Sequence, residues 1–441
     1  MKSIFIFRRD LRTKDNIGLN ECVSQSDYFY PIFIFTPEQI GTSNKYRSNN
    51  AIQFMCESIM ELQKEINLTL FYGDQYIIIK HLINKLNIDA IFTNTDYTPY
   101  AIKRDTKLSK LCKDAGINFY TFHDTILYPP NIIKVYQKFT PYYNKAIKIN
   151  VNKPSNKTIK NDRKIQTKKI NMHKFYKENY DVIIKGGRSN GLKIYSRISQ
   201  FKNYNKTKNI LSISTTHLSA YIKFGCLSIR EIYYKIKDTL GLKHPLIRQL
   251  IWREFYYQLE IAFSDRFGKS LKPKYDKIKW NGKQSTFNIW CDASTGYPIV
   301  DACMQELNTT GYLHNRGRLI VSSFLVKNLQ HDWRKGEKYF AQQLLDYDPI
   351  VNQGNWQWTA GSGADSQPYF RIFNPWLQSK NYDPDCEYIK KWLPELKNVD
   401  NKHIHQWDKF YNDYPDVDYP NPIVDYNKTK IETLKMYKQI Y

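Results

Sequence analysis

Residues 346–376, DYDPIVNQGNWQWTAGSGADSQPYFRIFNPW, bring together side chains that can contact a charged or aromatic ligand: Asp346, Asp348, an arginine and three tryptophans. Glycines and a proline interrupt any regular period, so the stretch is predicted to be an ordered loop system that joins helices. Long irregular loops within a domain are often functional, and a glycine-rich surface loop with buried indoles is the alternative. All nine tryptophans of the chain lie at or after Trp252, which favours a site in the second half.

A helical stretch, RQLIWREFYYQLEIAF (248–263), carries a second set of candidate side chains. Helical spacing places on one face Gln249, Trp252, Arg253 and Tyr256. An arginine beside an indole suits a ligand that combines a ring with a phosphate, yet the same pair is also common in helical cores.

Hydroxyl side chains precede a short helix in STTHLSAYIKFG (214–225), and a glycine ends that helix. Thr215, Thr216 and Ser219 could cap the helix or could bind a phosphate together with free backbone N–H groups. From these residues alone, capping is the favoured interpretation.

The stretch LHNRGRLIVSSFLV (313–326) is a third helix of this kind. Its stripe of Asn315, Leu319 and Ser322 has two arginines, Arg316 and Arg318, beside it. Because the chain has helical patterns from about residue 190 onward, helices are expected to position all of these side chains.

The first half of the chain has a different pattern, in which short apolar runs alternate with helical stretches. The expected strands are residues 3–7, 30–35, 68–74, 89–94 and 117–122, and helices are expected over 51–66 and 101–115. This alternation predicts a parallel sheet with helices on both faces, a fold that binds ligands at the carboxyl ends of its strands. No G-x-G-x-x-G follows the first strand, so the dinucleotide fingerprint is absent.

Basic residues are in excess in the chain, above all over residues 134–174. That stretch holds eleven lysines and Arg163 against one acid, Asp162, and is predicted to be a solvated, partly extended linker, with direct DNA contact as the alternative. Over the whole chain, 66 Lys and Arg against 42 Asp and Glu give a net charge of +24. Such an excess indicates a polyanionic partner such as nucleic acid, although an A/T-biased genome could also enrich lysine.

The seven cysteines are scattered and form no C-x-x-C motif. This pattern argues against a disulfide framework, a zinc ribbon or an iron–sulfur cluster, and for a reducing compartment. No signal peptide opens the chain, and no apolar run approaches about 18 residues. We therefore expect a soluble intracellular protein, in the cytoplasm or nucleus, without a metal site or a membrane contact.

The second half of the chain resembles the photolyase/cryptochrome family in a series of motifs, which are in order LIWREFYYQL, TGYPIVDACMQELNTTGYLHNRGR, SSFLVKNLQHDWRKGEKYF, LLDYDPIVNQGNWQW, YFRIFNPW and KWLPEL. The chain is most similar to class I cyclobutane pyrimidine dimer photolyases, and the resemblance is dense from residue 204 to 422. It is weaker over 1–130, where FIFRRDLRTKDN resembles the opening strand and turn of the family.

The resemblance implies an N-terminal α/β antenna domain with a Rossmann-like parallel sheet over residues 1–128 and an all-α FAD-binding domain over 196–441. Residues 129–195 would form a basic interdomain linker. The implied activity is that of a deoxyribodipyrimidine photo-lyase: a dimer in UV-damaged DNA is flipped out and is split by an electron from excited reduced FAD. The protein is expected to be a monomer.

The resemblance also assigns residues to the cofactor. The phosphates of FAD would be held by Tyr204, Thr215, Thr216, His217, Leu218 and Ser219, and its ring system would be contacted by Trp252, Arg253, Arg318, Asp346, Tyr347, Asp348 and Asn352. Asp346 and Asp348 would hold the polar edge of the flavin, with Arg318 paired to Asp346. Asn352 would face N5, where an amide suits a flavin kept as a reduced anion.

Other residues are assigned to DNA and to electron transfer. The lesion and its strand would be contacted by Gln249, Trp252, Arg253, Asn315, Arg316, Leu319, Trp358, Arg371 and, by weaker analogy, Lys208. Electrons would reach the flavin through Trp356, Trp333 and Trp280, because indoles are among the most easily oxidised side chains. Without the resemblance, ordinary core packing would be the favoured role of these three tryptophans.

Several positions depart from the class I pattern. Gln249 stands where dimer photolyases usually carry a glutamate, and Leu319 stands where a methionine usually packs on the dimer. Tyr100 and Ala101 stand where folate binders carry Asn-Glu, so the second chromophore is expected to be a deazaflavin or to be absent.

The remaining alternatives are six-four photoproduct repair, a non-repairing blue-light receptor of the cryptochrome type, and a DASH-type protein that prefers single strands. Asn315 and Leu319 argue against the first, since six-four photolyases carry catalytic histidines there. The long C-terminal extension usual in the receptors is not part of this sequence.

Overall fold

The core of the N-terminal half is divided between the two faces of a parallel sheet. The computed structural model describes residues 1–155 and 157–440. Within strands β1 (Lys2–Phe7) and β2 (Tyr28–Phe35), phenylalanines and isoleucines alternate and belong to two separate buried clusters. Because successive side chains of a strand point to opposite faces, this alternation buries both faces of the sheet.

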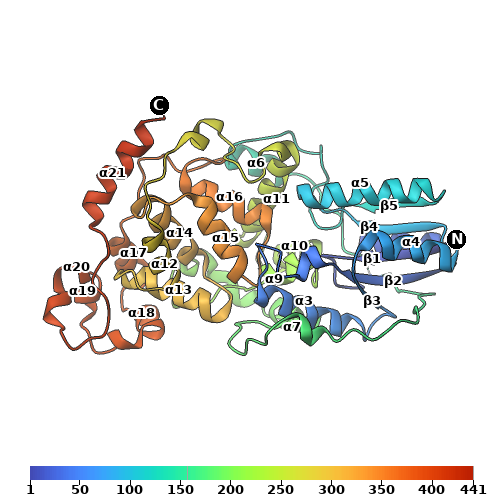
Figure 1. Ribbon diagram of the computed structural model, residues 1–441, viewed down its shortest axis with the longest axis horizontal. Coiled ribbons are helices and arrows are strands. Elements are labelled where there is room, and N and C mark those ends of the chain that lie inside the picture. Colours follow the sequence, from blue (N-terminus) through green and yellow to red (C-terminus); the bar gives the residue numbers. More distant parts are fainter. Residues whose placement is uncertain (156, 441) are drawn as a thin grey trace.

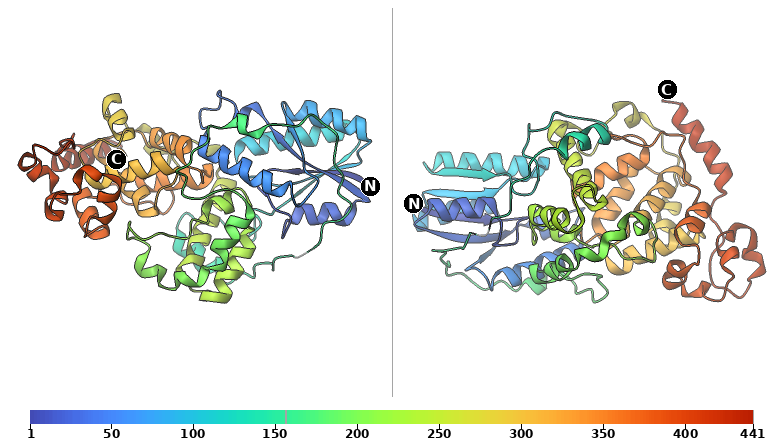
Figure 2. Two further views of the ribbon diagram at one scale, coloured as in Figure 1. Left: turned by 90° about the horizontal axis from the view of Figure 1, so that it is seen from below. Right: turned by 180° about the vertical axis from the view of Figure 1, so that it is seen from behind.

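The sheet has the strand order β3-β2-β1-β4-β5, and every neighbouring pair is parallel. The remaining strands are β3 (Thr69–Tyr72), β4 (Ala90–Asn94) and β5 (Asn118–Phe122). One face is covered by α1 (Ile17–Gln25) and α3 (Asn49–Leu62), and the other by α4 (Gln75–Leu86) and α5 (Pro99–Asp114) (Figures 1 and 2). The predicted alternation of strands and helices is therefore confirmed.

The second half of the described chain is built from helices, as the sequence predicted (Figure 1). They are α7 (Arg188–Ser196), α8 (Tyr204–Thr207), α9 (Ser219–Lys223), α10 (Ile229–Leu240), α11 (Pro245–Ala262), α12 (Gln284–Cys291), α13 (Pro298–Thr310), α14 (Asn315–Ser323), α15 (Trp333–Gln343), α16 (Pro349–Ala360), α17 (Pro375–Tyr382), α18 (Glu387–Trp392), α19 (Asn401–Ile404), α20 (Trp407–Phe410) and α21 (Tyr426–Lys438). The long α11 begins where sequence rules place a helix start: His244 accepts from the N–H of Leu246, and Pro245 follows it.

The prediction of a loop system over residues 346–376 is wrong for its first part, which forms α16. The Asp348 side chain accepts from two free N–H groups at the start of this helix, Pro349 follows, and Gly361 ends it with a φ of +82°. These signals at both ends outweigh Gly354 inside the helix. Gly354 itself is required there, because a Cβ would lie 2.3 Å from the Tyr256 ring. The irregular segment is limited to residues 361–374.

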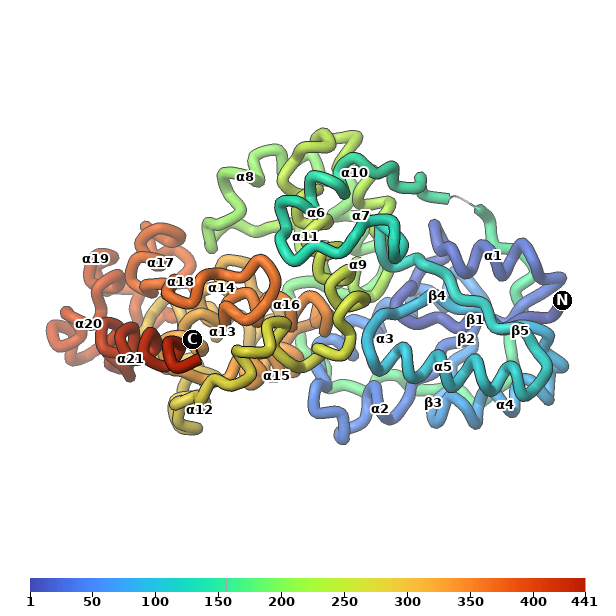
Figure 3. The backbone as a smooth tube through the Cα atoms, turned by 90° about the horizontal axis from the view of Figure 1, so that it is seen from above, coloured from blue at the N-terminus to red at the C-terminus, as the bar shows by residue number. Residues whose placement is uncertain are grey.

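The basic stretch 134–174 is less solvated than predicted. It contains α6 (Phe139–Ala146), in which Phe139 and Tyr142 are buried against α11. Further along, the backbone of Phe29 exchanges hydrogen bonds with Asn161 and Arg163, so this part lies against the beginning of β2. In Figure 3 the stretch crosses from the sheet to the helical half and returns. Aromatic anchors within a lysine-rich sequence explain why the charge pattern alone was misleading.

No helix among the residues that the structure describes is long and apolar enough to cross a membrane. The same residues contain no group of His, Cys, Asp and Glu side chains that could hold a metal ion.

Candidate functional site

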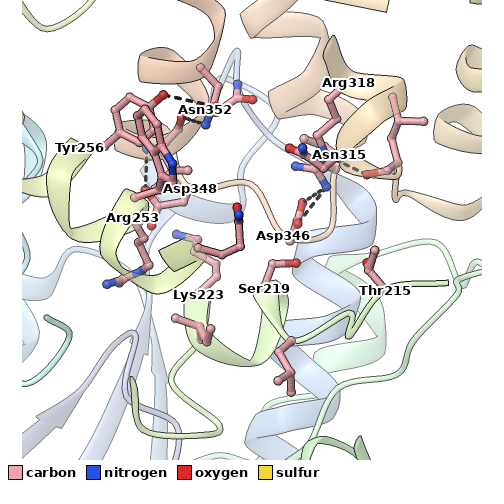
Figure 4. A pocket seen from close by; sticks show the side chains of 18 of the residues that line it. Thr215, Ser219, Lys223, Arg253, Tyr256, Asn315, Arg318, Asp346, Asp348 and Asn352 are labelled. Atoms are coloured by element: carbon pink, nitrogen blue, oxygen red, sulfur yellow. Dashed lines mark hydrogen bonds and ion pairs between the residues drawn. The ribbon is translucent and has the colours of Figure 1, made fainter. Parts of the chain in front are cut away.

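Helices α9, α11, α14 and α16 surround a cavity of about 470 Å³. A cavity of this size is within the range of roughly 300–1,000 Å³ that is usual for cofactor sites. The candidate residues of the sequence that line it are Tyr204, Thr215, Thr216, His217, Leu218, Ser219, Gln249, Trp252, Arg253, Asn315, Arg318, Leu319, Asp346, Tyr347, Asp348, Asn352, Trp356 and Trp358. Figure 4 shows Arg318 and Asp346 on one side of this cavity and Arg253, Tyr256 and Asp348 on the other.

The hydroxyl-rich segment 215–219 lines one wall without capping the helix that follows it. The N-cap of α9 is Leu218, whose position carries no side-chain cap. The hydroxyl of Thr215 lies 3.4 Å from Tyr312 Oη, and His217 has the left-handed φ of +50° that histidine adopts more readily than most residues. The favoured capping interpretation is therefore wrong, and Thr215 and Ser219 are placed for a polar ligand in the cavity.

An ion pair between Arg318 and Asp346 fixes one side of the cavity, as predicted. Arg318 Nη2 lies 3.0 Å and 2.9 Å from the two carboxylate oxygens of Asp346, and its Nε donates to the carbonyl of Leu313 at 2.8 Å. The Asp346 side chain is almost fully buried. The pair presents to the cavity a carboxylate whose position is set by the arginine.

On the opposite side, Asp348 is held by an arginine from the N-terminal half. Arg9 forms ion pairs with Asp348 and with Asp96, and it also donates to Tyr257 Oη and to the carbonyl of Lys223. Burial alone would raise the pKa of Asp348, but the charges of Arg9, Lys223 and Arg253 hold it well below its usual range. The N-terminal half therefore holds Asp348 from behind the cavity wall, while the lining residues themselves come from the helical half.

Arg9 and Lys223 were not among the candidates from the sequence. Burial and the neighbouring charge of Arg9 lower the pKa of Lys223 to about 8. Arg9 lies two residues after the end of β1. β1 has β2 on one side and β4 on the other, so the strand order reverses there, and ligands of such sheets bind at the carboxyl ends of the strands at this point. That position was the one signal in the sequence that could have indicated Arg9.

Asn352 is oriented by a neighbouring acid. Its Nδ2 donates to the backbone carbonyl and to Oε1 of Glu337, at 3.2 Å and 3.1 Å. The hydroxyl of Tyr347 donates to the same oxygen at 3.0 Å. Burial raises the pKa of Glu337, and the hydrogen bonds from Asn352 and Tyr347 oppose that shift.

Trp356 connects the cavity with a buried aromatic cluster. Its ring packs against α15 where Gly336 leaves room, because a Cβ at Gly336 would lie 2.2 Å from that ring. Trp333 belongs to the same cluster and is buried, and Trp280 is half-buried at its edge. The structure adds Trp290, whose ring centroid lies 6.4 Å from that of Trp356 and which was not a candidate.

The indole of Trp252 has one face already covered. Phe139 from α6 stacks on it at 3.6 Å, with the planes within 3° of each other. Its neighbour Arg253 points into the protein, where it pairs with Glu254 at 2.8 Å and lies over the Tyr257 ring. This orientation of Arg253 favours a contact with a cofactor over a contact with DNA phosphate.

The other basic candidates lie outside the cavity wall. Arg316 donates to Asn209 at 2.9 Å and lies over the Tyr382 ring. Burial lowers the pKa of Arg316, and the charge of Arg371 acts in the same direction. Lys208 donates to Asn205 on its own helix turn.

Comparison with known proteins gives matches over most of the chain. Residues 246–439 match the family model described as the FAD binding domain of DNA photolyase, and residues 3–158 match the model described as DNA photolyase. The deoxyribodipyrimidine photo-lyase of Buchnera aphidicola (strain APS) is 36% identical, with 99% of this chain and 97% of that protein covered. The enzyme of the same name from Escherichia coli K12 is 30% identical, with 98% and 97% covered.

Solved structures agree with these matches. An archaeal photolyase from Sulfolobus tokodaii with two FAD molecules is 38% identical and superposes with a TM-score of 0.91 over 100% of both chains. A cryptochrome from Synechocystis sp. PCC6803 is 26% identical, with a TM-score of 0.90 over 99% of both chains.

Proposed function

Because this chain belongs to the DNA photolyase family, we propose that it binds DNA carrying a cyclobutane pyrimidine dimer and splits the dimer in the light, with FAD as cofactor. One observation carries the proposal: the residues expected to hold FAD and those expected to contact the lesion line the same cavity. A lesion that enters this cavity would lie within contact distance of the cofactor.

The lining residues fit a flavin dinucleotide. The hydroxyls of Thr215 and Ser219 suit its phosphates, and the Arg318–Asp346 pair together with Asn352 suits the polar edge of its ring. FAD, when bound and reduced, supplies the electron that opens the dimer. Asn352 is held by Glu337 and adds no charge beside the ring. An uncharged amide favours an anionic ring in this position.

The remaining lining residues would receive an extruded dimer. A dimer within a duplex cannot reach a buried cofactor, and a damaged pair costs less to unstack than an intact one. Trp358 and the uncovered face of Trp252 offer stacking surfaces, and Phe139 supports Trp252 from behind. Gln249 offers an amide that can bond the edge of a pyrimidine.

The experiment that tests the proposal uses purified protein and duplexes that carry either a dimer or a six-four photoproduct. Light should remove the dimer and leave the six-four photoproduct, because Asn315 and Leu319 provide no acid for the latter. Loss of neither lesion would favour a non-repairing receptor, for which Gln249 and the similarity to the Synechocystis cryptochrome are the supporting observations.

Gln249→Glu should tighten binding of dimer-containing DNA several-fold. Gln249 lines the cavity, and its carbonyl can accept from a thymine N3–H while its NH₂ faces the thymine carbonyls. A charged acceptor makes a stronger hydrogen bond than a neutral one, by roughly 1 kcal/mol. Equilibrium binding in the dark measures the effect, and undamaged DNA is the control. Weaker or unchanged dimer binding would mean that Gln249 does not contact the lesion.

Arg316→Ala and Arg371→Ala should each weaken binding of damaged and undamaged DNA about fivefold. Damaged and undamaged DNA should be affected alike because phosphate contacts carry little sequence information. Each substitution should also reduce the slope of log K against log[salt] by about 1, because one fewer counterion is released on binding. Titrations at several salt concentrations measure both quantities. A loss limited to damaged DNA would indicate that these arginines contact the lesion instead.

The second chromophore is expected to be a deazaflavin-type ring or to be absent. Tyr100, at the start of α5, is 54% exposed with Arg104 over its ring, and this surface suits a flat aromatic ligand. The related archaeal photolyase with two FAD molecules supports this class of ligand. After reconstitution and gel filtration, folate should not stay bound, and any second chromophore that does should be a deazaflavin or flavin. One equivalent of retained folate would contradict this prediction.

A further inference from the structure

Lys327 is a buried lysine without a carboxylate partner among the residues that the structure describes. It lies in a π-helical turn, Phe324–Asn328, that continues α14, and its side chain is 1% exposed. Burial lowers the pKa of Lys327 to about 7, and no charged group among the described residues offsets that cost. Such a position is expensive for a charged group, and only the polar and aromatic groups around the ammonium can offset that cost.

The contacts of Lys327 join three segments that are distant in the sequence. Its Nζ lies 3.4 Å from the carbonyl of Ala360, at the end of α16, and 3.4 Å from the carbonyl of Tyr369, in the segment 361–374. It also lies 3.7 Å from the centre of the Tyr437 ring on α21. Tyr437 Oη donates to the same Ala360 carbonyl at 2.8 Å.

An ammonium suits this place chemically. The carbonyls at the end of a helix lack partners within the helix and carry partial negative charge, which a cation stabilises. A lysine head is compact and has three donors, so it can reach two carbonyls and the face of an aromatic ring together. Gly361 begins the irregular segment directly after Ala360. A Cβ built at Gly361 would lie 3.9 Å from Lys327 Nζ.

Two of the three segments that Lys327 joins carry the proposed DNA contacts. The last turns of α16 contain Trp358 and Thr359, which line the cavity. The segment 361–374 contains Phe370, which is 63% exposed, and the exposed Arg371. A shift of this segment relative to α16 would move the phosphate contact away from the stacking surface.

We propose that Lys327 is a positioning residue for DNA binding, which ties the end of α16 to the segment 361–374 and so sets Arg371 relative to Trp358. The inference rests on the proposed function in so far as it concerns damaged DNA. Lys327 itself touches neither the lesion nor the cofactor, since it is absent from the cavity wall.

Lys327→Met is the informative variant, because methionine has a similar length and no charge. The melting temperature should stay the same or rise, since a buried charge is removed. FAD content should be unchanged, affinity for dimer-containing DNA should fall about fivefold as for a lost phosphate contact, and repair at saturating DNA should persist. Lys435→Met is the matched control, because Lys435 is an exposed lysine on α21.

Tyr437→Phe is a second variant at the same carbonyl. It removes the hydroxyl that donates to Ala360 and leaves the ring beneath the ammonium. It should weaken DNA binding in the same direction as Lys327→Met but by less. The proposal would be overturned if Lys327→Met lowered the melting temperature, the FAD content and the DNA affinity together. That result would indicate a general structural role for Lys327.

Hydrogen exchange separates this inference from the proposed function. The amides of Ser362, Gly363 and Arg371 donate to backbone carbonyls and report directly on the segment. They should exchange faster in Lys327→Met than in the wild type, and no faster in Lys435→Met. Unchanged exchange would overturn the inference whatever the wild type repairs. Faster exchange in a protein whose wild type repairs no dimer would support the link made by Lys327 and contradict only the proposed function.

Discussion

Trp356→Phe is expected to slow light-driven reduction of oxidised FAD by at least about tenfold. Trp356 both lines the cavity and packs into the cluster that contains Trp333, so it is the proposed first donor of the chain that ends at Trp280. A phenyl ring is far harder to oxidise than an indole and occupies less space beside Gly336. The variant should therefore fold normally and lose electron supply.

The measurement is the decrease in absorbance of oxidised FAD under blue light with an external reductant. Repair of dimers by the chemically reduced variant should remain near that of the wild type, because that route bypasses the chain. Trp392→Phe is a suitable control, since Trp392 packs against the same cluster but is not one of the proposed donors. Unchanged photoreduction in Trp356→Phe would remove the tryptophan chain from the proposed function.

Asp348→Ala is expected to destabilise the fold by roughly 3–5 kcal/mol, because it leaves the buried Arg9 without one of its two carboxylates. It also removes the cap from two N–H groups of α16, which contributes about 1 kcal/mol of this loss. Asp348→Asn keeps a side chain that can cap α16 and removes only the charge. It should therefore lower the free energy of unfolding by about 1 kcal/mol less than Asp348→Ala does. Urea unfolding of both variants measures the difference.

Acid should abolish the advantage of the wild type over Asp348→Asn. Burial alone would raise the pKa of Asp348, but Arg9 and its neighbours hold it below the ordinary value. A carboxylate with a lowered pKa stabilises the fold fully above its unfolded pKa of about 4 and loses this contribution as the pH falls further. The stability difference should thus be constant from pH 7 to pH 5 and should shrink below pH 4. A difference as large at pH 3 as at pH 7 would mean that the charge of Asp348 is not its source.

Local patterns in the sequence were sufficient to predict the strands of the sheet and the faces that their side chains bury. The alternation of Phe and Ile in SIFIF and YPIFIF assigns each side chain to one of two buried faces, and the strands lie where predicted. The pairing of Arg318 with Asp346 was likewise predicted from the resemblance and is confirmed. The roles of the lining residues toward FAD and DNA remain predictions.

The errors have two physical causes. In α16, Gly354 suggests a loop, whereas the end signals Asp348, Pro349 and Gly361 decide the conformation. In the basic stretch, α6 exists because Phe139 and Tyr142 pack on α11, a tertiary contact that charge composition cannot indicate.

The residues that were missed act across the chain. Arg9 contacts Asp348, which lies 339 positions later in the sequence, and Lys327 contacts Tyr369, which lies 42 positions later. Neither contact leaves a local period, and only the fold brings the partners together. Such long-range contacts are what a single sequence could not provide.

The most direct test of the central claim follows one dimer-containing duplex through a dark and a light interval with the same FAD-loaded, chemically reduced protein. The dimer should stay intact and bound in the dark, and the two pyrimidines should be restored in the light in proportion to the FAD content. No restoration in the light, with the dimer bound and FAD present, would contradict the proposed function.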